Sequence, residues 1–451
     1  MQRFSRAFDR PAVVITVTTL AVLAAGTALL LAPFSWRGRA PSVIDALFTT
    51  ASALCVTGLT TVDTEHQWTA AGHAVILVLM QIGGLGVMVI ISMVALVTAH
   101  RLGVRQRLAA STLTPSTAHH APRLSAVMRG VFLTTIIVEG VVTAMLTWRF
   151  ADHYDLSLGR AAWFGLFHTV SAFNNAGFGL LSDNLIPFGR DPWILLPMAG
   201  AIILGGIGFP VIIEVVRHLR TGRSRGAHLS VHSRIMLAGT PVLLLLGTLL
   251  TLASEFTNAK TLGPMPWADK IVAALFHSTT SRTAGFNAID LSVAHSETWF
   301  ITDILMLIGA GPAGTAGGLK VTTFVILLAV IVSEVRGERD VRLFHRRIPD
   351  PVIRQVVALV GLFALLIIAA TLTISALESA GVERVLFETI SALTTTGLST
   401  GITMDLSWPS KLVLIVLMLL GRVGPVTLGA AFALRERPLL FTPPAERPII
   451  G

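Results

Sequence analysis

Four short segments of the chain join a polar stretch to a closing glycine, and the chemistry they could supply is that of backbone oxygen. Each begins at a phenylalanine, continues mainly through serine, threonine and alanine, and ends at glycine. Glycine adopts a positive φ without steric cost, so the carbonyl groups beside it can turn to one side. The segments are Phe48–Gly58, Phe167–Gly177, Phe276–Gly285 and Phe387–Gly397.

The closing glycines lie 119, 108 and 112 residues apart, which indicates an internal fourfold repeat. Four such loops around one axis would form rings of carbonyl oxygens that replace the water shell of a cation. These neutral oxygens suit a large monovalent ion better than Mg²⁺, so we predict K⁺. Ordinary outer loops with C-cap glycines are a fair alternative for one loop and a much weaker one for four. The predicted filter residues are Val56, Thr57, Gly58, Asn175, Ala176, Gly177, Thr283, Ala284, Gly285, Thr395, Thr396 and Gly397.

The elements that would hold these loops are membrane helices. Of 451 residues, 53% are apolar and 13% are charged, and the mean hydropathy is +0.75; soluble domains have about a quarter charged residues. We predict an all-α integral membrane fold of four tandem membrane-pore-membrane repeats, with eight spans and four re-entrant pore helices in pseudo-fourfold symmetry around one pore. The predicted spans are Ala12–Ala32, Ala74–Thr98, Val131–Trp148, Pro192–Ile213, Ile235–Ser254, Ile304–Ser333, Val356–Leu377 and Leu412–Leu434.

Arginines gather between spans two and three, four and five, and six and seven, which predicts that both termini are cytoplasmic. In a membrane protein, the net charge of +9 indicates arginine-rich cytoplasmic loops rather than nucleic-acid binding. The single cysteine, Cys55, excludes an intramolecular disulfide and a multi-cysteine metal site.

The predicted division of the chain is repeat 1 at 1–98, a linker at 99–123, repeat 2 at 124–217, a linker at 218–233, repeat 3 at 234–333, a linker at 334–350, repeat 4 at 351–436 and a cytoplasmic tail at 437–451.

The sixth span holds five glycines and a proline between Gly309 and Lys320, which predicts a broken helix. Its GxGxxG spacing follows no strand, so we reject dinucleotide binding. Arg422, in the middle of the eighth span, marks an ion path or a buried partner. The alternative for Arg422 is an ion pair with Glu139 or Glu388. For Arg282, beside the third predicted filter loop, we expect an acidic partner such as Asp45 or Glu388.

The motifs together resemble a known family, the Trk/Ktr/HKT superfamily of potassium transporters, nearly from end to end. Eight spans and a short C-terminal tail resemble the membrane subunit of Ktr-type potassium uptake systems most closely. The stretches that carry the resemblance are Cys55–Thr64, Phe173–Phe178, Arg282–Asn287 and Ala392–Leu398.

This resemblance implies potassium uptake across the cell membrane by a homodimer with one pore per subunit, gated by a cytosolic ring of nucleotide-binding regulatory subunits. It implies that the 309–320 loop obstructs the path below the filter and that Arg422 faces the pore. It implies that the protein lies in the lipid bilayer and transports K⁺, with Na⁺ as a candidate activator. No organic cofactor and no nucleic-acid partner is expected. The gate residues that it implies are Gly309, Gly311, Gly314, Thr315, Gly317, Gly318, Lys320 and Arg422.

Two other functions stay open. An ion-coupled secondary carrier of a small solute would need inverted repeats, whereas these repeats are parallel. An intramembrane enzyme would need convergent acids, bases or metal ligands, and only scattered single charges occur within the spans. We therefore expect a transporter and no enzyme.

Overall fold

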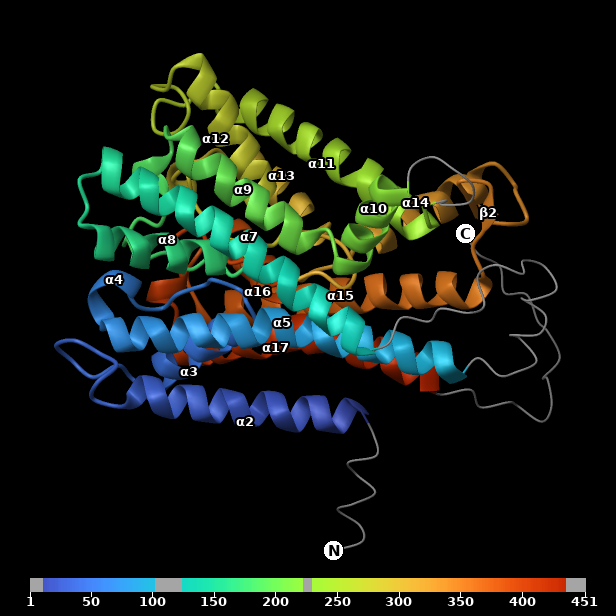
Figure 1. The fold of residues 1–451 in the computed structure, drawn as a ribbon, viewed down its shortest axis with the longest axis horizontal. Coiled ribbons are helices and arrows are strands. Elements are labelled where there is room, and N and C mark those ends of the chain that lie inside the picture. Colours follow the sequence, from blue (N-terminus) through green and yellow to red (C-terminus); the bar gives the residue numbers. More distant parts are fainter. Residues whose placement is uncertain (1–10, 102–123, 222–228, 435–451) are drawn as a thin grey trace, which may run out of the picture.

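The computed structural model describes residues 11–101, 124–221 and 229–434, which are largely helical (Figure 1). Helices suit a chain of this composition because a helix pairs its own backbone groups, as lipid requires. The helices outside the four predicted pore-helix positions that have twelve residues or more are α2 (Pro11–Leu31), α5 (Ala70–Arg101), α7 (Leu124–His153), α9 (Pro192–Gly206), α10 (Phe209–Thr221), α11 (Val231–Glu255), α13 (Ser296–Leu307), α14 (Val321–Val335), α15 (Asp350–Leu377) and α17 (Trp408–Leu434).

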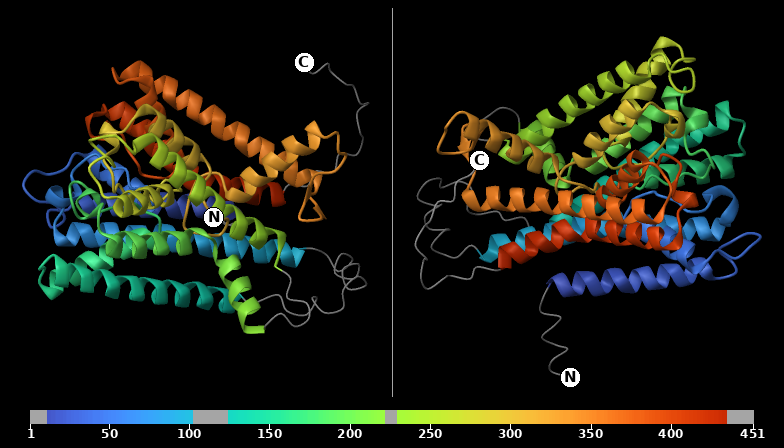
Figure 2. Two further views of the ribbon diagram at one scale, coloured as in Figure 1. Left: turned by 90° about the horizontal axis from the view of Figure 1, so that it is seen from above. Right: turned by 180° about the vertical axis from the view of Figure 1, so that it is seen from behind.

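A helix shorter than the one before it occupies each of the four predicted pore-helix positions, and we call these four the short helices. Each packs against the long helix that precedes it in the chain, as α8 does against α7 and α12 against α11. Figure 2 shows from two more sides that most of the helices run beside one another in one bundle. These four helices are α3 (Val43–Leu54), α8 (Leu158–Phe173), α12 (Trp267–Thr280) and α16 (Val382–Thr394). The remaining short helices are α4 (Thr64–Gln67), η1 (Ile186–Phe188), η2 (Leu291–Val293) and η3 (Thr403–Asp405).

Three helices among the described residues are long and apolar enough to cross a membrane: Met128–His153 within α7, α11 and α15. A fourth span results if α9 and α10, which are bent by 99° at a short break, count together. The predicted span Pro192–Ile213 is broken into two helices, because Gly208 has a φ of +95° and interrupts it. The predicted break in span six is confirmed, since α13 ends at Leu307 and α14 begins at Val321. The count of eight spans and the repeat boundaries stay predictions.

A small basic hairpin joins α14 to α15. Its strands, β1 (Arg342–Leu343) and β2 (Arg346–Arg347), pair antiparallel across a turn of two positive-φ residues. The hairpin and the N-terminal end of α2 lie toward the same end of the molecule, and α4 lies toward the other (Figure 1). Most of the other predicted cytoplasmic segments, 102–123, 222–228 and 437–451, lie outside the described residues.

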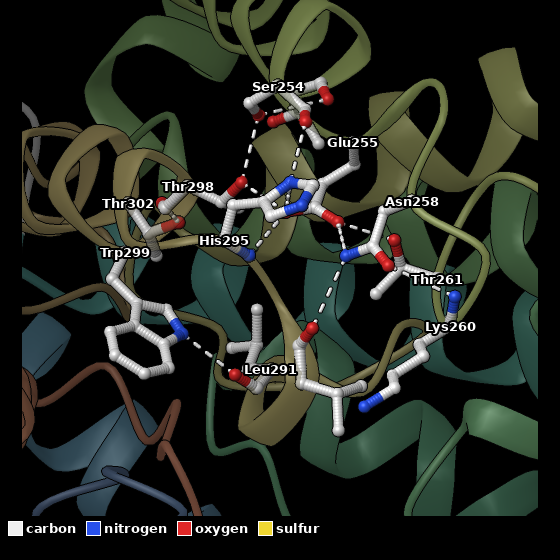
Figure 3. A network of polar contacts seen from close by, with 12 residues as sticks. Ser254, Glu255, Asn258, Lys260, Thr261, Leu291, His295, Thr298, Trp299 and Thr302 are labelled. Carbon is white, nitrogen blue, oxygen red and sulfur yellow. Dashed lines mark hydrogen bonds and ion pairs between the residues drawn. The ribbon is translucent and has the colours of Figure 1, made fainter.

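The connection from α11 to α13 is held by a buried carboxylate at the end of α11 (Figure 3). Glu255 is fully buried and accepts hydrogen bonds from both Asn258 Nδ2, at 2.6 Å, and His295 N, at 2.9 Å. The hydroxyl groups of Thr261 and Thr298 also donate to it. The carboxylate thus ties the end of α11 to the following loop and to the start of α13.

Replacing Glu255 by glutamine should lower the free energy of unfolding by about 2 kcal/mol, because an amide nitrogen cannot accept and leaves donors unpaired. The measurement is thermal unfolding in detergent, followed by tryptophan fluorescence. Glu297, which is exposed in the first turn of α13, supplies the control Glu297→Gln, for which no change is expected. Equal melting temperatures for the two variants would contradict this role of Glu255.

Candidate functional site

Four glycine loops follow the four short helices, and their glycines contact one another in a closed order. We define the loops as Val56–Gly58, Asn175–Gly177, Thr283–Gly285 and Thr395–Gly397. Every closing glycine has a positive φ, from +71° to +97°. A Cβ atom on each glycine would meet a backbone oxygen of the next loop. The distances from such an added Cβ atom are 2.5 Å from Gly58 to Ala176 O, 2.8 Å from Gly177 to Ala284 O, 2.2 Å from Gly285 to Thr396 O and 1.9 Å from Gly397 to Thr57 O.

The residue two positions before each closing glycine also has a left-handed backbone. The residues are Val56, Asn175, Thr283 and Thr395, with φ between +51° and +74°. This conformation is disfavoured for residues other than glycine, most of all for β-branched ones. Backbone strain of this kind persists only where the surroundings enforce it, and it is concentrated at functional sites.

Backbone N–H groups of each loop point back to the helix that precedes it. Because the N–H and the C=O of one trans peptide point in opposite directions, the carbonyls of Val56, Asn175, Thr283 and Thr395 point away from their helices. The hydrogen bonds that hold these N–H groups are Thr57 N to Ser52 O, Ala176 N to Ser171 O and Thr396 N to Ser391 O, each at 2.8 Å, and Ala284 N to Thr280 O at 2.9 Å.

The four acceptors are residues that the sequence analysis did not single out, although a signal was present. Each is a serine or threonine four positions after the phenylalanine that opens its segment. In two loops the hydroxyl adds a second bond, from Gly58 N to Ser52 Oγ and from Gly397 N to Ser391 Oγ, both at 3.0 Å. The pattern of phenylalanine followed by a hydroxyl residue therefore marks the support of each loop.

The 309–320 loop packs directly against three of the four glycine loops. Thr315 Oγ1 accepts from Asn175 Nδ2 at 2.6 Å and donates to Phe173 O at 2.9 Å. Gly317 N donates to Thr283 Oγ1 at 3.2 Å. A Cβ atom on Gly317 would lie 1.9 Å from Thr395 Oγ1, so a side chain at this position would force the loops apart.

The bend between α9 and α10 holds the same loop from the other side. Gly311 N and Thr315 N donate to Gly206 O and Gly205 O at 2.8 and 3.0 Å. The ends of the loop meet in a bridge between Ile308 and Leu319. The loop is thus fixed between this bend and the glycine loops.

Two cationic side chains lie at the 309–320 loop, the buried Arg422 and the half-buried Lys320, and both bind backbone oxygens. Arg422 donates through Nη1 to Thr315 O and through Nη2 to Gly83 O, the latter at 2.9 Å. Lys320 Nζ donates to Ala316 O at 2.6 Å and to Gly317 O at 3.1 Å. The guanidinium of Arg422 therefore joins the loop to α5.

The acidic partners considered for Arg422 are engaged elsewhere. Glu139 accepts from Gln81 Nε2 at 3.2 Å. Glu388 accepts from Thr400 N at 2.9 Å and from the hydroxyl of Thr403 at 2.6 Å. The alternative of an ion pair with either acid is wrong, because hydroxyl, amide and backbone groups already satisfy both carboxylates.

Within residues 11–101, 124–221 and 229–434, neither of the acids expected for Arg282 pairs with it. Asp45 pairs with Lys411 at 3.2 Å, and Glu388 is held as described above. Arg282 is 4% exposed, and its Nε and Nη1 atoms have no hydrogen-bond partner. The expectation was wrong because Asp45 and Glu388 are both engaged with other groups.

Within the described parts of the chain, no group of three or more histidine, cysteine, aspartate or glutamate side chains is placed to hold a metal ion. What the glycine loops offer a cation is backbone oxygen. Their arrangement suits an ion that passes through rather than one bound by side chains.

The chain is similar to known proteins over most of its length. The family described as TrkH, cation transport protein, matches residues 2–439. Ktr system potassium uptake protein B of Vibrio alginolyticus is 38% identical over 441 residues, which cover 97% of this chain and 94% of that protein. The protein of the same name from Bacillus subtilis (strain 168) is 36% identical over 441 residues, which cover 97% of this chain and 96% of that protein.

A solved structure shares the fold. The crystal structure of the potassium transporter TrkH from Vibrio parahaemolyticus matches with a TM-score of 0.70 and covers 92% of this chain and 83% of that one. The sequences are 19% identical in this match, so it shows the fold alone.

Proposed function

Because the chain belongs to the TrkH family of cation transport proteins, we propose that it takes up potassium across the cell membrane through a pore in each subunit. The resemblance found in the sequence is confirmed, since the relatives are Ktr system proteins named for potassium uptake and match over 97% of the chain. The chain is accordingly a transporter rather than an enzyme.

The proposed selectivity filter consists of the four glycine loops, related by pseudo-fourfold symmetry. The single observation that carries this proposal is the closed order of contacts among Gly58, Gly177, Gly285 and Gly397. Carbonyls that point away from all four short helices can face a common axis and replace the water of a K⁺ ion. One short loop per unit provides few carbonyl rings, so discrimination against Na⁺ should be modest.

The proposed gate is the 309–320 loop together with Arg422. The loop contacts three glycine loops and is bonded to the guanidinium, so its displacement would alter the inner side of the filter. A fixed positive charge near the path also opposes the entry of K⁺. Opening would require that Arg422 release Thr315 O.

The finer parts of the proposal follow from the family resemblance. The chain forms a homodimer in the cell membrane, both termini are cytoplasmic, and a cytosolic ring of nucleotide-binding subunits moves the gate. Both relatives are named as protein B of a Ktr system, and a name of this kind supports such a partner. Na⁺ is proposed as an activator.

The proposal is tested with the purified full chain in liposomes. A membrane potential that is negative inside should drive uptake of radioactive rubidium, unlabelled K⁺ should compete, and Na⁺ should raise the rate. Addition of the regulatory ring with its nucleotide should change the rate. Rubidium uptake that needs an organic co-substrate would contradict a channel-like pore and favour a secondary carrier.

A further inference from the structure

An acidic side chain lies within the apolar helix α7. Glu139 belongs to the stretch Met128–His153, which is long and apolar enough to cross a membrane, and it is half-buried. A charge at this depth is costly and usually marks a functional contact. The carboxylate oxygens of Glu139 accept from Gln81 Nε2 of α5, at 3.2 and 3.4 Å. Among the described residues no ion pair is found for Glu139, so its partner is an uncharged amide.

The amide of Gln81 connects Glu139 to the second glycine loop. A carboxylate only accepts hydrogen bonds, so Gln81 must turn Nε2 toward Glu139 and Oε1 away from it. Gln81 Oε1 accepts from Asn174 Nδ2 at 2.8 Å. Asn174 is fully buried at the end of α8 and directly precedes Asn175, the left-handed residue of the loop. The acid on α7 therefore fixes the orientation of two amides at the start of this loop.

The second glycine loop lacks a support that two other loops have. In the first and fourth loops the N–H of the closing glycine donates to the hydroxyl of Ser52 or Ser391. Ser171 occupies the same position in the second unit, yet its Oγ atom is buried and finds no hydrogen-bond partner in the described part of the chain. Asn184 Nδ2 donates to Gly177 O at 3.0 Å and holds the last residue of the loop. The start of the loop depends on α5 and α7 instead of a serine hydroxyl.

The turn of α5 that follows Gln81 is itself fixed in place. Gly83 O accepts from Arg422 Nη2 at 2.9 Å. A Cβ atom on Gly84 would lie 1.9 Å from Asn174 Oδ1, so α5 and the end of α8 are in close contact. Gln81 therefore extends toward Asn174 from a segment that is held on two sides.

We propose that Gln81 and Glu139 are positioning residues that hold the second glycine loop at the spacing K⁺ requires. Both act through Asn174 rather than on the ion. A loop without this support could move toward the axis, where its oxygens would suit the smaller Na⁺ ion better, so the preference for K⁺ would fall. This role rests on the proposed function, because it takes the glycine loops as the filter.

The first test is Gln81→Leu, which keeps a side chain of similar size and removes both amide contacts. The ratio of rubidium uptake to sodium uptake in liposomes should fall by about fivefold, the equivalent of one hydrogen bond. Gln355, which is exposed on α15, supplies the control Gln355→Leu, and its ratio should not change. An unchanged ratio in Gln81→Leu would overturn the positioning role.

An exchange of the two side chains separates the effect of these hydrogen bonds from that of packing. In the double variant Gln81→Glu with Glu139→Gln, the carboxylate on α5 can accept from Asn174 Nδ2 and from the amide on α7. Both hydrogen bonds then keep a donor and an acceptor, so the uptake ratio should be close to that of the unchanged chain. A ratio as low as that of Gln81→Leu would overturn the proposal.

Hydrogen exchange in the full chain gives a readout that does not depend on transport. The N–H of Ala176 donates to Ser171 O, and in Gln81→Leu it should exchange faster by about fivefold. The N–H of Thr396 in the fourth loop should exchange at its usual rate. Equal exchange at Ala176 in the variant and the unchanged chain would overturn the positioning role. Faster exchange in a protein that carries neither rubidium nor sodium would contradict the proposed function and leave the support of the loop standing.

Discussion

Replacing Gly285 by alanine is expected to lower rubidium uptake by about a hundredfold. The glycine has a φ of +79°, where an alanine is strained. The added Cβ atom would lie 2.2 Å from Thr396 O and 3.1 Å from Gly397 Cα, both of which are backbone atoms of the neighbouring loop. Because backbone cannot turn aside as a flexible side chain can, the third and fourth glycine loops must separate. The carbonyl oxygens would then no longer surround a K⁺ ion.

The measurement is rubidium uptake into liposomes at matched protein content. Gly140 supplies the control, since it lies in α7 and a Cβ atom there would meet nothing within 4 Å. Gly140→Ala should transport as the unchanged chain does. Undiminished uptake by Gly285→Ala would show that the close contact of the third and fourth loops is not needed for permeation.

Replacing Arg422 by alanine is expected to raise rubidium uptake by roughly tenfold when the regulatory subunits are absent. The side chain bonds the 309–320 loop through Thr315 O and α5 through Gly83 O. Hydrogen bonds from a charged donor each stabilise by about 1.5–3 kcal/mol, and about 1.4 kcal/mol is enough for a tenfold change in a rate. Loss of these bonds favours the displaced loop, and loss of the charge removes a barrier to K⁺.

Arg354→Ala is the matched control, because Arg354 is exposed on α15 and no hydrogen bond or ion pair is found between it and the 309–320 loop. Its uptake should not change. Uptake that falls in Arg422→Ala, in protein that still binds the regulatory ring, would show that Arg422 supports an open path rather than a closed one.

The glycine loops could be predicted because the same local signal occurs four times. A phenylalanine, a hydroxyl residue four positions later and a closing glycine describe a helix end followed by a turn, and each step depends on nearby residues only. The broken sixth span could be predicted for the same reason, since five glycines and a proline cannot sustain a helix. The assignment of these loops to a filter stays a prediction.

The sequence could not show which of two similar glycine runs bends the chain. Gly83–Gly86 and Gly205–Gly208 have the same glycine spacing, yet α5 continues through the first and the chain bends by 99° at the second. The difference is tertiary. A Cβ atom on Gly208 would lie 2.4 Å from Pro312 O, so the bend is fitted to the 309–320 loop.

The partners of the buried arginines were also beyond sequence reasoning. An acidic partner can be sought by residue type. Every residue has a backbone carbonyl, so the sequence could not show that Arg422 binds Thr315 O and Gly83 O. For Arg282, no carboxylate in the described part of the chain forms an ion pair. Residue types therefore do not reveal that backbone oxygens meet the charge of Arg422.

The most direct test of the central claim is the position of rubidium in crystals of the full chain. Anomalous scattering should place the ion between the four glycine loops, within coordination distance of backbone oxygens from each of them. Occupancy should fall when K⁺ is added in excess. Rubidium bound only elsewhere, with no density between Gly58, Gly177, Gly285 and Gly397, would contradict the account.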